Sequence, residues 1–216
     1  MIGRPLLILL MTVASACGGT ASSAAAPGAT LPPARVTRDS SSADLVPAGF
    51  GTLKQDEVAI VMQTSSVRIS AIPLDEAVIR VIAPDSYRTL HATLESRRQQ
   101  IAQLAAQRGV RDPRVWYVTF TGLAPDARFI PTDITVASSG RDFRPFDVIA
   151  LTTGFGEQRL QPNTVQRGLL LFDDRLDVSQ PMVVSMGTER NTDWETTLRR
   201  IDAERASIRA RAGSRP

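Results

Sequence analysis

The sequence predicts an α+β fold, an antiparallel β-sandwich with one long helix before the main strands and one C-terminal helix. Three observations support this prediction. Short apolar runs alternate with turn signals between residues 114 and 187, without helices between them, which is typical of an antiparallel sandwich. The segments 85–108 and 194–213 instead carry apolar side chains at helical spacing. The first 47 residues have the composition of a signal sequence followed by a tether.

Residues 1–16 have the pattern of a secretory signal peptide. Arg4 supplies a positive charge, residues 6–11 supply an apolar run, and Ala14-Ser15-Ala16 supplies the small residues that a signal peptidase needs. The apolar stretch is about half of the ~20 residues that a membrane-spanning helix needs. We therefore do not expect it to be a permanent transmembrane segment.

The single cysteine follows this signal directly. The segment Val13-Ala14-Ser15-Ala16-Cys17 resembles the lipobox of bacterial lipoproteins, with Ala14 where leucine is usual. The resemblance implies that Cys17 is lipidated, with palmitate among its acyl chains, and anchors the chain to a membrane of the cell envelope. Gly18, where aspartate would otherwise stand, is similar to the pattern retained on the outer membrane, facing the periplasm or the cell surface. The alternative is a plain secretory signal followed by a free cysteine.

Residues 17–47 are predicted to form a disordered linker behind the anchor. Of residues 18–47, 22 are Ala, Gly, Ser, Thr or Pro and none is aromatic, so the segment buries too little apolar surface to offset its ordering entropy. As a flexible coil it would reach about 30 Å. A folded extension held by Leu31, Val36 and Leu45 is the alternative. The remainder, 48–216, is predicted to be a single folded domain.

Two strands, 57–63 and 66–72, open this domain around the turn Thr64-Ser65. The second alternates strictly, and Pro73 closes it. The segment 75–82 follows, and its pattern fits either a short helix with acidic residues in the first turn or a third strand rich in β-branched residues.

The first long helix is predicted from Asp85 to Arg108, with Gly109 as its stop signal. A dense β-run, 114–121, comes next. The apolar stripe of the helix is interrupted by Arg97 and consists of Tyr87, Leu90, Leu94, Ile101 and Leu104. The inward face of the β-run consists of Trp116, Val118 and Phe120.

Four further apolar runs are predicted strands, at 129–137, 146–152, 165–172 and 182–186. The segment 159–172, a proline-containing turn followed by Gly168-Leu169-Leu170-Leu171-Phe172, resembles the paired late strands of immunoglobulin-like domains in bacterial surface lipoproteins. This resemblance implies an immunoglobulin-like architecture and carries no function with it.

The C-terminal helix is predicted to begin after the cap Asn191-Thr192-Asp193. Its apolar stripe consists of Trp194, Leu198, Ile201 and Ile208 and is interrupted by Arg205, much as Arg97 interrupts the first helix. We therefore expect the two long helices to pack near each other, on or beside the sheet.

Composition excludes several kinds of chemistry. One cysteine cannot form an internal disulfide, and with one histidine it cannot build a His/Cys zinc or haem site. The 25 basic residues exceed the 22 acidic ones by only three, so no strong positive field points to nucleic acid. The phosphate-binding, dinucleotide-binding and nucleophile-elbow motifs are absent from the sequence. We expect no cofactor and no metal.

Several residues that could carry chemistry also have simpler structural explanations. His91 could act as a base but fits a partly exposed helix position, and Lys54 could activate a serine but begins a poorly patterned segment. The acidic residues of 173–177 fit a calcium site less well than a solvated turn with Arg175 as counter-charge. The pair Asp75-Glu76 fits a helix N-terminus. The arginine-rich segment 199–215 is interleaved with acids and fits a solvated helix face, with weak binding to anionic lipid or cell-wall polymer as the alternative.

Two functions remain. The first is a non-catalytic, lipid-anchored binding or structural module that contacts an envelope protein or polymer; it predicts one exposed apolar or aromatic patch and no deep pocket. The second is an exported hydrolase or transferase with a carboxylate-based site. It predicts a cleft in which two or more carboxylates converge, from the set Asp126, Asp133, Asp142, Asp147 and Glu157.

Overall fold

The computed structural model describes residues 45–156 and 159–213, which belong to one compact unit, Asp39–Pro216. The predicted signal peptide, Cys17, most of the predicted linker and Glu157 lie outside the described residues. Val46 is only 3% exposed, and the guanidinium of Arg80 donates a hydrogen bond to its main-chain oxygen at 3.2 Å. The core of the domain therefore includes Val46, two residues before the predicted start of the folded domain.

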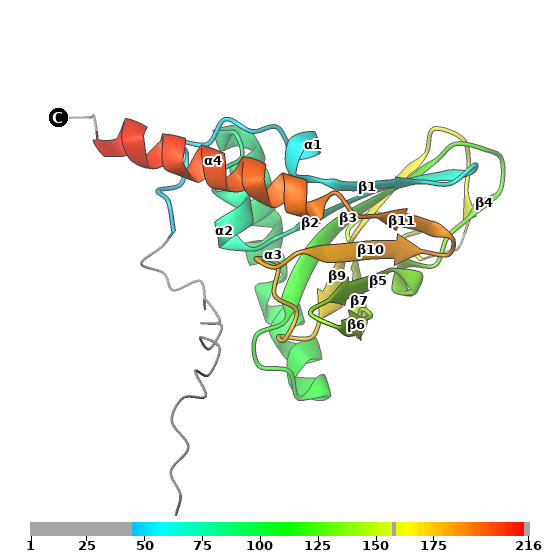
Figure 1. Ribbon diagram of the computed structural model, residues 1–216. Coiled ribbons are helices and arrows are strands. Elements are labelled where there is room, and N and C mark those ends of the chain that lie inside the picture. Colours follow the sequence, from blue (N-terminus) through cyan, green and yellow to red (C-terminus); the bar gives the residue numbers. More distant parts are fainter. Residues whose placement is uncertain (1–44, 157–158, 214–216) are drawn as a thin grey trace, which may run out of the picture. The chain divides into compact units, whose positions relative to one another are not determined.

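A five-stranded antiparallel sheet forms the centre of the structure, in the order β1-β2-β3-β9-β7 (Figure 1). The strands are β1 (Ile60–Gln63), β2 (Val67–Pro73), β3 (Arg114–Gly122), β7 (Asp147–Ala150) and β9 (Val165–Phe172). The central strand β3 pairs with β2 on one side and with β9 on the other. Its predicted inward residues, Trp116, Val118 and Phe120, are fully buried.

A smaller antiparallel sheet has the order β11-β10-β5-β6. Its strands are β5 (Thr135–Ser138), β6 (Arg141–Phe143), β10 (Met182–Met186) and β11 (Glu189–Asn191). Val136 and Val184 are paired and fully buried, whereas their neighbours Thr135 and Ser185 point to the opposite face. A two-stranded ladder joins β4 (Ala127–Arg128) to β8 (Arg159–Leu160), and the 3-10 turn η2 (Pro131–Asp133) precedes β5.

The inner faces of the two larger sheets share one hydrophobic core, which makes the arrangement sandwich-like. Aromatic rings fill part of it: the ring centroids of Phe120 and Phe129 lie 4.4 Å apart, and those of Phe120 and Phe155 lie 5.9 Å apart. The predicted α+β fold with antiparallel sheets is therefore confirmed at this level.

The described residues form four α-helices: α1 (Gln55–Val58), α2 (Glu76–Ile79), α3 (Pro84–Arg108) and α4 (Trp194–Gly213). The predicted stripes of α3 and α4 face the core, with Leu90, Ile101, Ile201 and Ile208 buried. Gly109 ends α3 in the left-handed conformation (φ 69°), as its position predicted. None of the helices in these described segments combines the length and apolarity needed to span a bilayer.

Some predicted elements are corrected by the structure. The strand predicted from residue 57 begins at Ile60, because Gln55–Val58 forms a helical turn. Of the two alternatives for the segment 75–82, the short helix is confirmed: the carboxylate of Asp75 caps α2 by accepting a hydrogen bond from the Ala77 N–H at 2.8 Å. Pro131 starts the turn η2, which restricts the strand predicted at 129–137 to β5.

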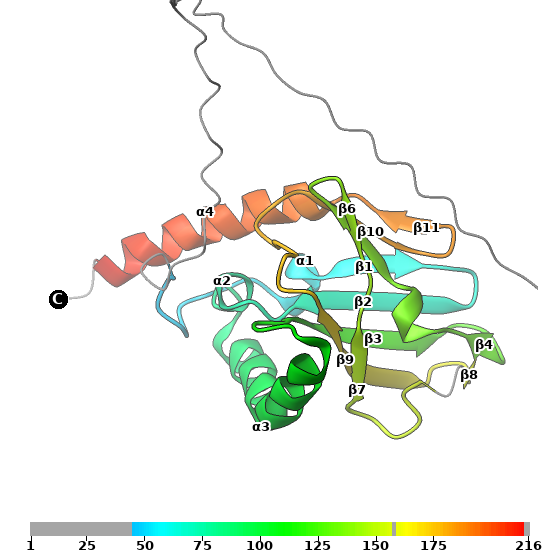
Figure 2. The same ribbon diagram turned by 90° about the horizontal axis from the view of Figure 1, so that it is seen from below.

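The two long helices were expected to pack near each other, and the structure has a third helix between them. Figure 2 shows α2 between them, with α4 on one side and α3 on the other. Arg205 holds α4 against α2, because its guanidinium donates two hydrogen bonds, at 2.6 and 3.2 Å, to the main-chain oxygen of Ala77 in α2.

The two strands of the segment 159–172, β8 and β9, are not paired with each other, unlike the paired late strands that this segment resembles. β8 pairs with β4, and β9 pairs with β3 and β7.

Candidate functional site

The predicted carboxylates fall into three groups. Glu157 lies outside the described residues. Asp126 sits in the turn before β4, within 3.5 Å of the Gln161 side-chain amide, and Asp147 opens β7, where its own carboxylate accepts the Val148 N–H at 2.8 Å. Asp133 and Asp142 line the same depression. The structure therefore brings together two of the five.

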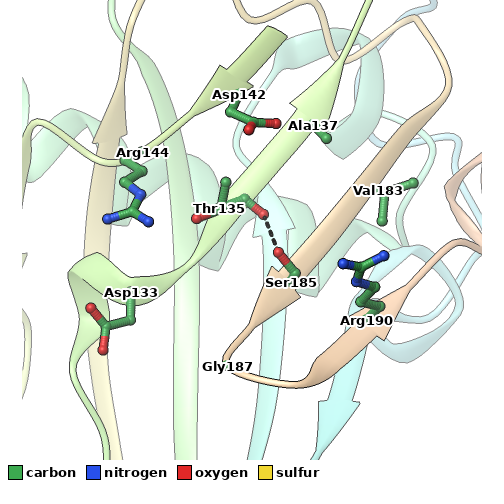
Figure 3. A pocket seen from close by; sticks show the side chains of 9 residues that line it. All are labelled: Asp133, Thr135, Ala137, Asp142, Arg144, Val183, Ser185, Gly187 and Arg190. Atoms are coloured by element: carbon green, nitrogen blue, oxygen red, sulfur yellow. Dashed lines mark hydrogen bonds between the residues drawn. The ribbon is translucent and has the colours of Figure 1, made fainter. Parts of the chain in front are cut away.

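This depression covers the outer face of the small sheet and has a volume of about 540 Å³ (Figure 3). Strand alternation explains its lining, because every second residue of a strand points away from the core. Thr135 lies opposite Ser185 and Ala137 lies opposite both Val183 and Asp142. We call it the small-sheet depression, and its lining consists of Asp133, Thr135, Ala137, Asp142, Arg144, Val183, Ser185, Gly187 and Arg190.

The charges of the small-sheet depression are balanced and mixed. Figure 3 shows Arg144 between Asp133 and Asp142, with Arg190 on the opposite side. The Ser185 hydroxyl donates to the main-chain oxygen of Thr135 at 3.5 Å. All four charged residues are exposed. The surface thus offers hydrogen-bond donors and acceptors side by side to a ligand that approaches from solvent.

This geometry suits recognition better than two-carboxylate catalysis. Carboxylates that share acid–base work in glycoside hydrolysis flank one reacting bond, about 5–10 Å apart, in a site that limits water. Asp133 and Asp142 are exposed, and Arg144 stands between them. The guanidinium and the open shape favour a site that binds a polar ligand.

Asp142 has a central position in this part of the molecule. It lines the small-sheet depression and two neighbouring depressions of about 360 and 450 Å³. Its strand, β6, is the short edge of the small sheet. The sequence identified Asp142 only as one member of a set of acids, because its place in the same depression as Asp133 depends on the pairing of β6 with β5.

Hydrogen bonds from Arg175 and Ser179 satisfy two of the carboxylates in the acidic turn after β9. The Arg175 side chain donates to both oxygens of Asp173, at 2.7 and 2.8 Å, and these bonds hold the pKa of that carboxyl well below its usual range. Asp177 accepts from the N–H and the hydroxyl of Ser179. The prediction that Arg175 is a local counter-charge is confirmed. Across residues 45–156 and 159–213, no three His, Cys, Asp or Glu side chains gather as metal ligands would.

The other predicted candidates lie apart from the small-sheet depression. His91 is a half-exposed residue of α3, with its Nε2 atom 3.6 Å from a carboxylate oxygen of Glu76. Lys54 precedes α1, and its main-chain N–H donates to Glu57 at 2.8 Å. Neither residue is brought to a serine in a catalytic arrangement by a contact that the structure describes.

The arginine-rich segment 199–215 was expected to form a solvated helix face, but three of its arginines bind other parts of the domain. Arg200, Arg205 and Arg211 donate hydrogen bonds to main-chain oxygens of Glu57, Ala77 and Phe50, at 2.6 to 3.2 Å. These bonds fasten α4 to the N-terminal part of the domain. The sequence does not show them, because each joins residues more than 100 positions apart.

Large exposed apolar side chains are few among the described residues: Leu123, Ile130 and Val165. Leu123 follows β3 and Val165 begins β9 at the same end of this strand pair, while Ile130 follows β4. Single exposed apolar residues are ordinary on proteins in water. The exposed apolar patch expected of a binding module is therefore not found among the described residues, and the polar small-sheet depression is the stronger candidate site.

In comparisons with family models, curated proteins and solved structures, nothing matches this chain. The function must therefore be argued from the site and the sequence.

Proposed function

We propose that this chain is a lipid-anchored protein of the bacterial cell envelope that acts as a non-catalytic binding or structural module for an envelope protein or polymer. Two features support the proposal. The lipobox-like segment ending at Cys17 supports the anchor and the address on the outer membrane, and the small-sheet depression supports binding.

The small-sheet depression carries the binding part of the proposal. Deep, mostly apolar cavities enclose small ligands, whereas this depression is open and polar. Arg144 and Arg190 can each donate two parallel hydrogen bonds to a carboxylate or similar group, and Asp133 and Asp142 can accept from amines, amides or hydroxyls. An extended chain bearing both kinds of group, such as a peptide loop or an envelope polymer, fits these requirements.

Photo-cross-linking in intact cells tests this surface. A benzophenone amino acid at Val183, inside the depression, is expected to form a discrete adduct with an envelope component. The same group at Thr119, on the opposite face of the large sheet, is the matched control and is expected to form little. Equal adducts at both positions, or none at Val183, would contradict the proposal.

The anchor has a separate test. Cys17→Ser removes the thiol that a lipobox requires, so the variant is expected to leave the outer-membrane fraction while the wild type stays in it. Retention of the Cys17→Ser protein in that membrane would show that the anchor assignment is wrong. Because the substitution lies far in sequence from the small-sheet depression, this result is independent of the cross-linking result.

An exported hydrolase or transferase is the second candidate, supported by the shared depression of Asp133 and Asp142. It predicts that purified protein cleaves an envelope polymer and that Asp142→Asn and Asp133→Asn each abolish the cleavage. The binding module predicts no turnover, with both variants still folded.

We also infer that the sandwich is related in architecture to immunoglobulin-like domains. Two antiparallel sheets around one core support this inference. An experimental structure tests it: a strand order that cannot be superposed on an immunoglobulin-like sandwich would contradict it.

A further inference from the structure

A second depression, next to β6, is lined by four arginines. They come from three separate parts of the chain: Arg108 ends α3, Arg141 and Arg144 belong to β6 and the residue after it, and Arg175 lies in the turn after β9. Its volume is about 450 Å³. We call it the arginine depression. Arg108, Arg141 and Arg175 do not line the small-sheet depression, so the two surfaces can be tested separately.

Three of the four guanidiniums are available to a ligand. Arg175 is occupied by Asp173, which accepts two of its side-chain hydrogen bonds. Arg108, Arg141 and Arg144 are exposed and make no side-chain hydrogen bond or ion pair within the described part of the chain. Two carboxylates line the arginine depression. Asp173 is paired with Arg175, and Asp142 makes no side-chain hydrogen bond or ion pair within the described part of the chain. Positive charge therefore exceeds negative charge, and an anion is the ligand that this balance favours.

Three apolar side chains also line the arginine depression. Phe143 is buried, and Val110 and Phe146 are half-buried. A charge-assisted hydrogen bond is stronger where protein replaces part of the surrounding water. A guanidinium also matches the oxygen geometry of phosphate with two parallel bonds, which an ammonium cannot do. Three such groups in one depression offer enough donors for a doubly charged oxyanion.

From these contacts we propose that the arginine depression binds a phosphate-type oxyanion, either free in solution or carried on a lipid headgroup. The site goes beyond the proposed binding module, because Arg108, Arg141 and Arg175 are not part of the small-sheet depression and the site does not depend on a location in the cell envelope. Arg108 and Arg141 hold the anion from opposite elements, and Arg144 stands between the two depressions.

A purely structural explanation of these charges makes a different prediction. β6 is an edge strand, and charged residues followed by Pro145 are the features that keep edge strands from pairing with other molecules. If protection of the edge were their whole role, removing Arg141 would promote aggregation and leave anion binding unchanged.

Calorimetric titration of the full-length chain in a non-ionic detergent tests the proposal. Two probes distinguish the sources: pyrophosphate stands for a free phosphate, and dihexanoyl phosphatidylglycerol below its micelle concentration stands for a lipid headgroup. Acetate at matched ionic strength is the control for a general charge effect. Binding of either phosphate probe, or of both, supports the site, and the tighter of the two identifies the source.

The variants decide whether the arginine depression is where the probe binds. Arg108→Gln combined with Arg141→Gln is expected to weaken binding of the phosphate probe by about tenfold or more, since two guanidiniums that donate charge-assisted hydrogen bonds to the probe are lost. Arg141→Lys is expected to weaken it less. Arg128→Gln, on β4 outside both depressions, is expected to have no effect.

Four results would overturn the proposal. They are no binding of either phosphate probe, acetate binding as tight as phosphate, an equal loss in Arg128→Gln, and unchanged phosphate binding in the folded double variant. An unchanged unfolding midpoint for each variant ensures that a loss of binding is not a loss of fold. Loss of binding in the double variant with unchanged cross-linking at Val183 would leave both proposals standing separately.

Discussion

The side-chain amide of Asn191 donates a hydrogen bond to the main-chain oxygen of Val61 at 3.0 Å, across 130 residues of sequence. Asn191 ends β11 and Val61 lies in β1, so the bond joins the edges of the two larger sheets. The other end of the same amide accepts the N–H of Asp193 at 3.0 Å, just before α4. One side chain thus fixes the closure of the sandwich and the start of the last helix.

Asn191→Ala is expected to lower the free energy of unfolding by about 1–3 kcal/mol, because it removes both bonds and leaves a half-buried carbonyl oxygen without its donor. Thr192→Ala, at the exposed neighbouring position, is the control and should change stability by less than about 0.5 kcal/mol. Urea denaturation measures both. Equal effects would show that the bond between the sheets contributes little.

The two tryptophans form a matched pair for measuring a buried hydrogen bond. Both are fully buried, but the Trp194 indole donates to the Val178 oxygen at 2.9 Å, whereas the Trp116 Nε1 atom has no partner within the described residues. Trp194→Phe should therefore cost about 1 kcal/mol or more beyond Trp116→Phe. Denaturation of the two variants tests this, and a larger loss for Trp116→Phe would contradict it.

Two strand glycines are expected to differ in how well they tolerate a methyl group. A Cβ at Gly122 would meet the main-chain oxygen of Gln161, whereas a Cβ at Gly168 would meet the ring of Phe155. A ring in a half-exposed loop can move more easily than the backbone. Gly122→Ala should thus destabilise more than Gly168→Ala, and adding Phe155→Ala should restore part of the stability lost in Gly168→Ala alone. Thermal unfolding of the three variants checks this order.

Stability should depend on pH through Asp173. Hydrogen bonds from Arg175 depress the pKa of Asp173 below its ordinary value of 3.8, so the unfolded chain takes up this proton first as the pH falls. The pair therefore stabilises the fold above about pH 4, and its contribution is lost progressively below that pH. Arg175→Gln should be less stable than wild type at neutral pH, with a difference that shrinks in acid. A difference that stays constant across this range would contradict the assignment.

Local patterns were sufficient to predict most of the scaffold. The stripes of α3 and α4, the stop at Gly109 and the inward face of β3 depend on neighbours a few residues apart, and a period of 3.6 or 2 reveals them. Contacts between distant segments were not predictable in this way. The placement of α2 between the long helices depends partly on the hydrogen bond from Arg205 to Ala77. The sequence shows an arginine within an apolar stripe, but it does not indicate which distant residue accepts its hydrogen bonds.

The candidate site illustrates the same limit. The sequence placed Asp133 and Asp142 in a set of five acids, and the structure brings these two into the small-sheet depression. Arg144 and Arg190, which give this surface its mixed charges, were not singled out. Their position depends on the registers of β5 with β6 and of β10 with β11. Two-residue turns at Ser139-Gly140 and Gly187-Thr188 set these registers, but residues 141–143 and 189–191 lack the apolar run that would predict a strand after each turn.

The most direct test of the proposed binding surface is the yield of the Val183 cross-link in intact cells when a single arginine is reversed in charge. Arg190→Glu changes the small-sheet depression, and Arg128→Glu makes the same change on β4, outside it. If the depression binds the envelope ligand, Arg190→Glu should lower the yield by about tenfold while Arg128→Glu leaves it unchanged. Equal yields in the two variants would contradict recognition by this surface.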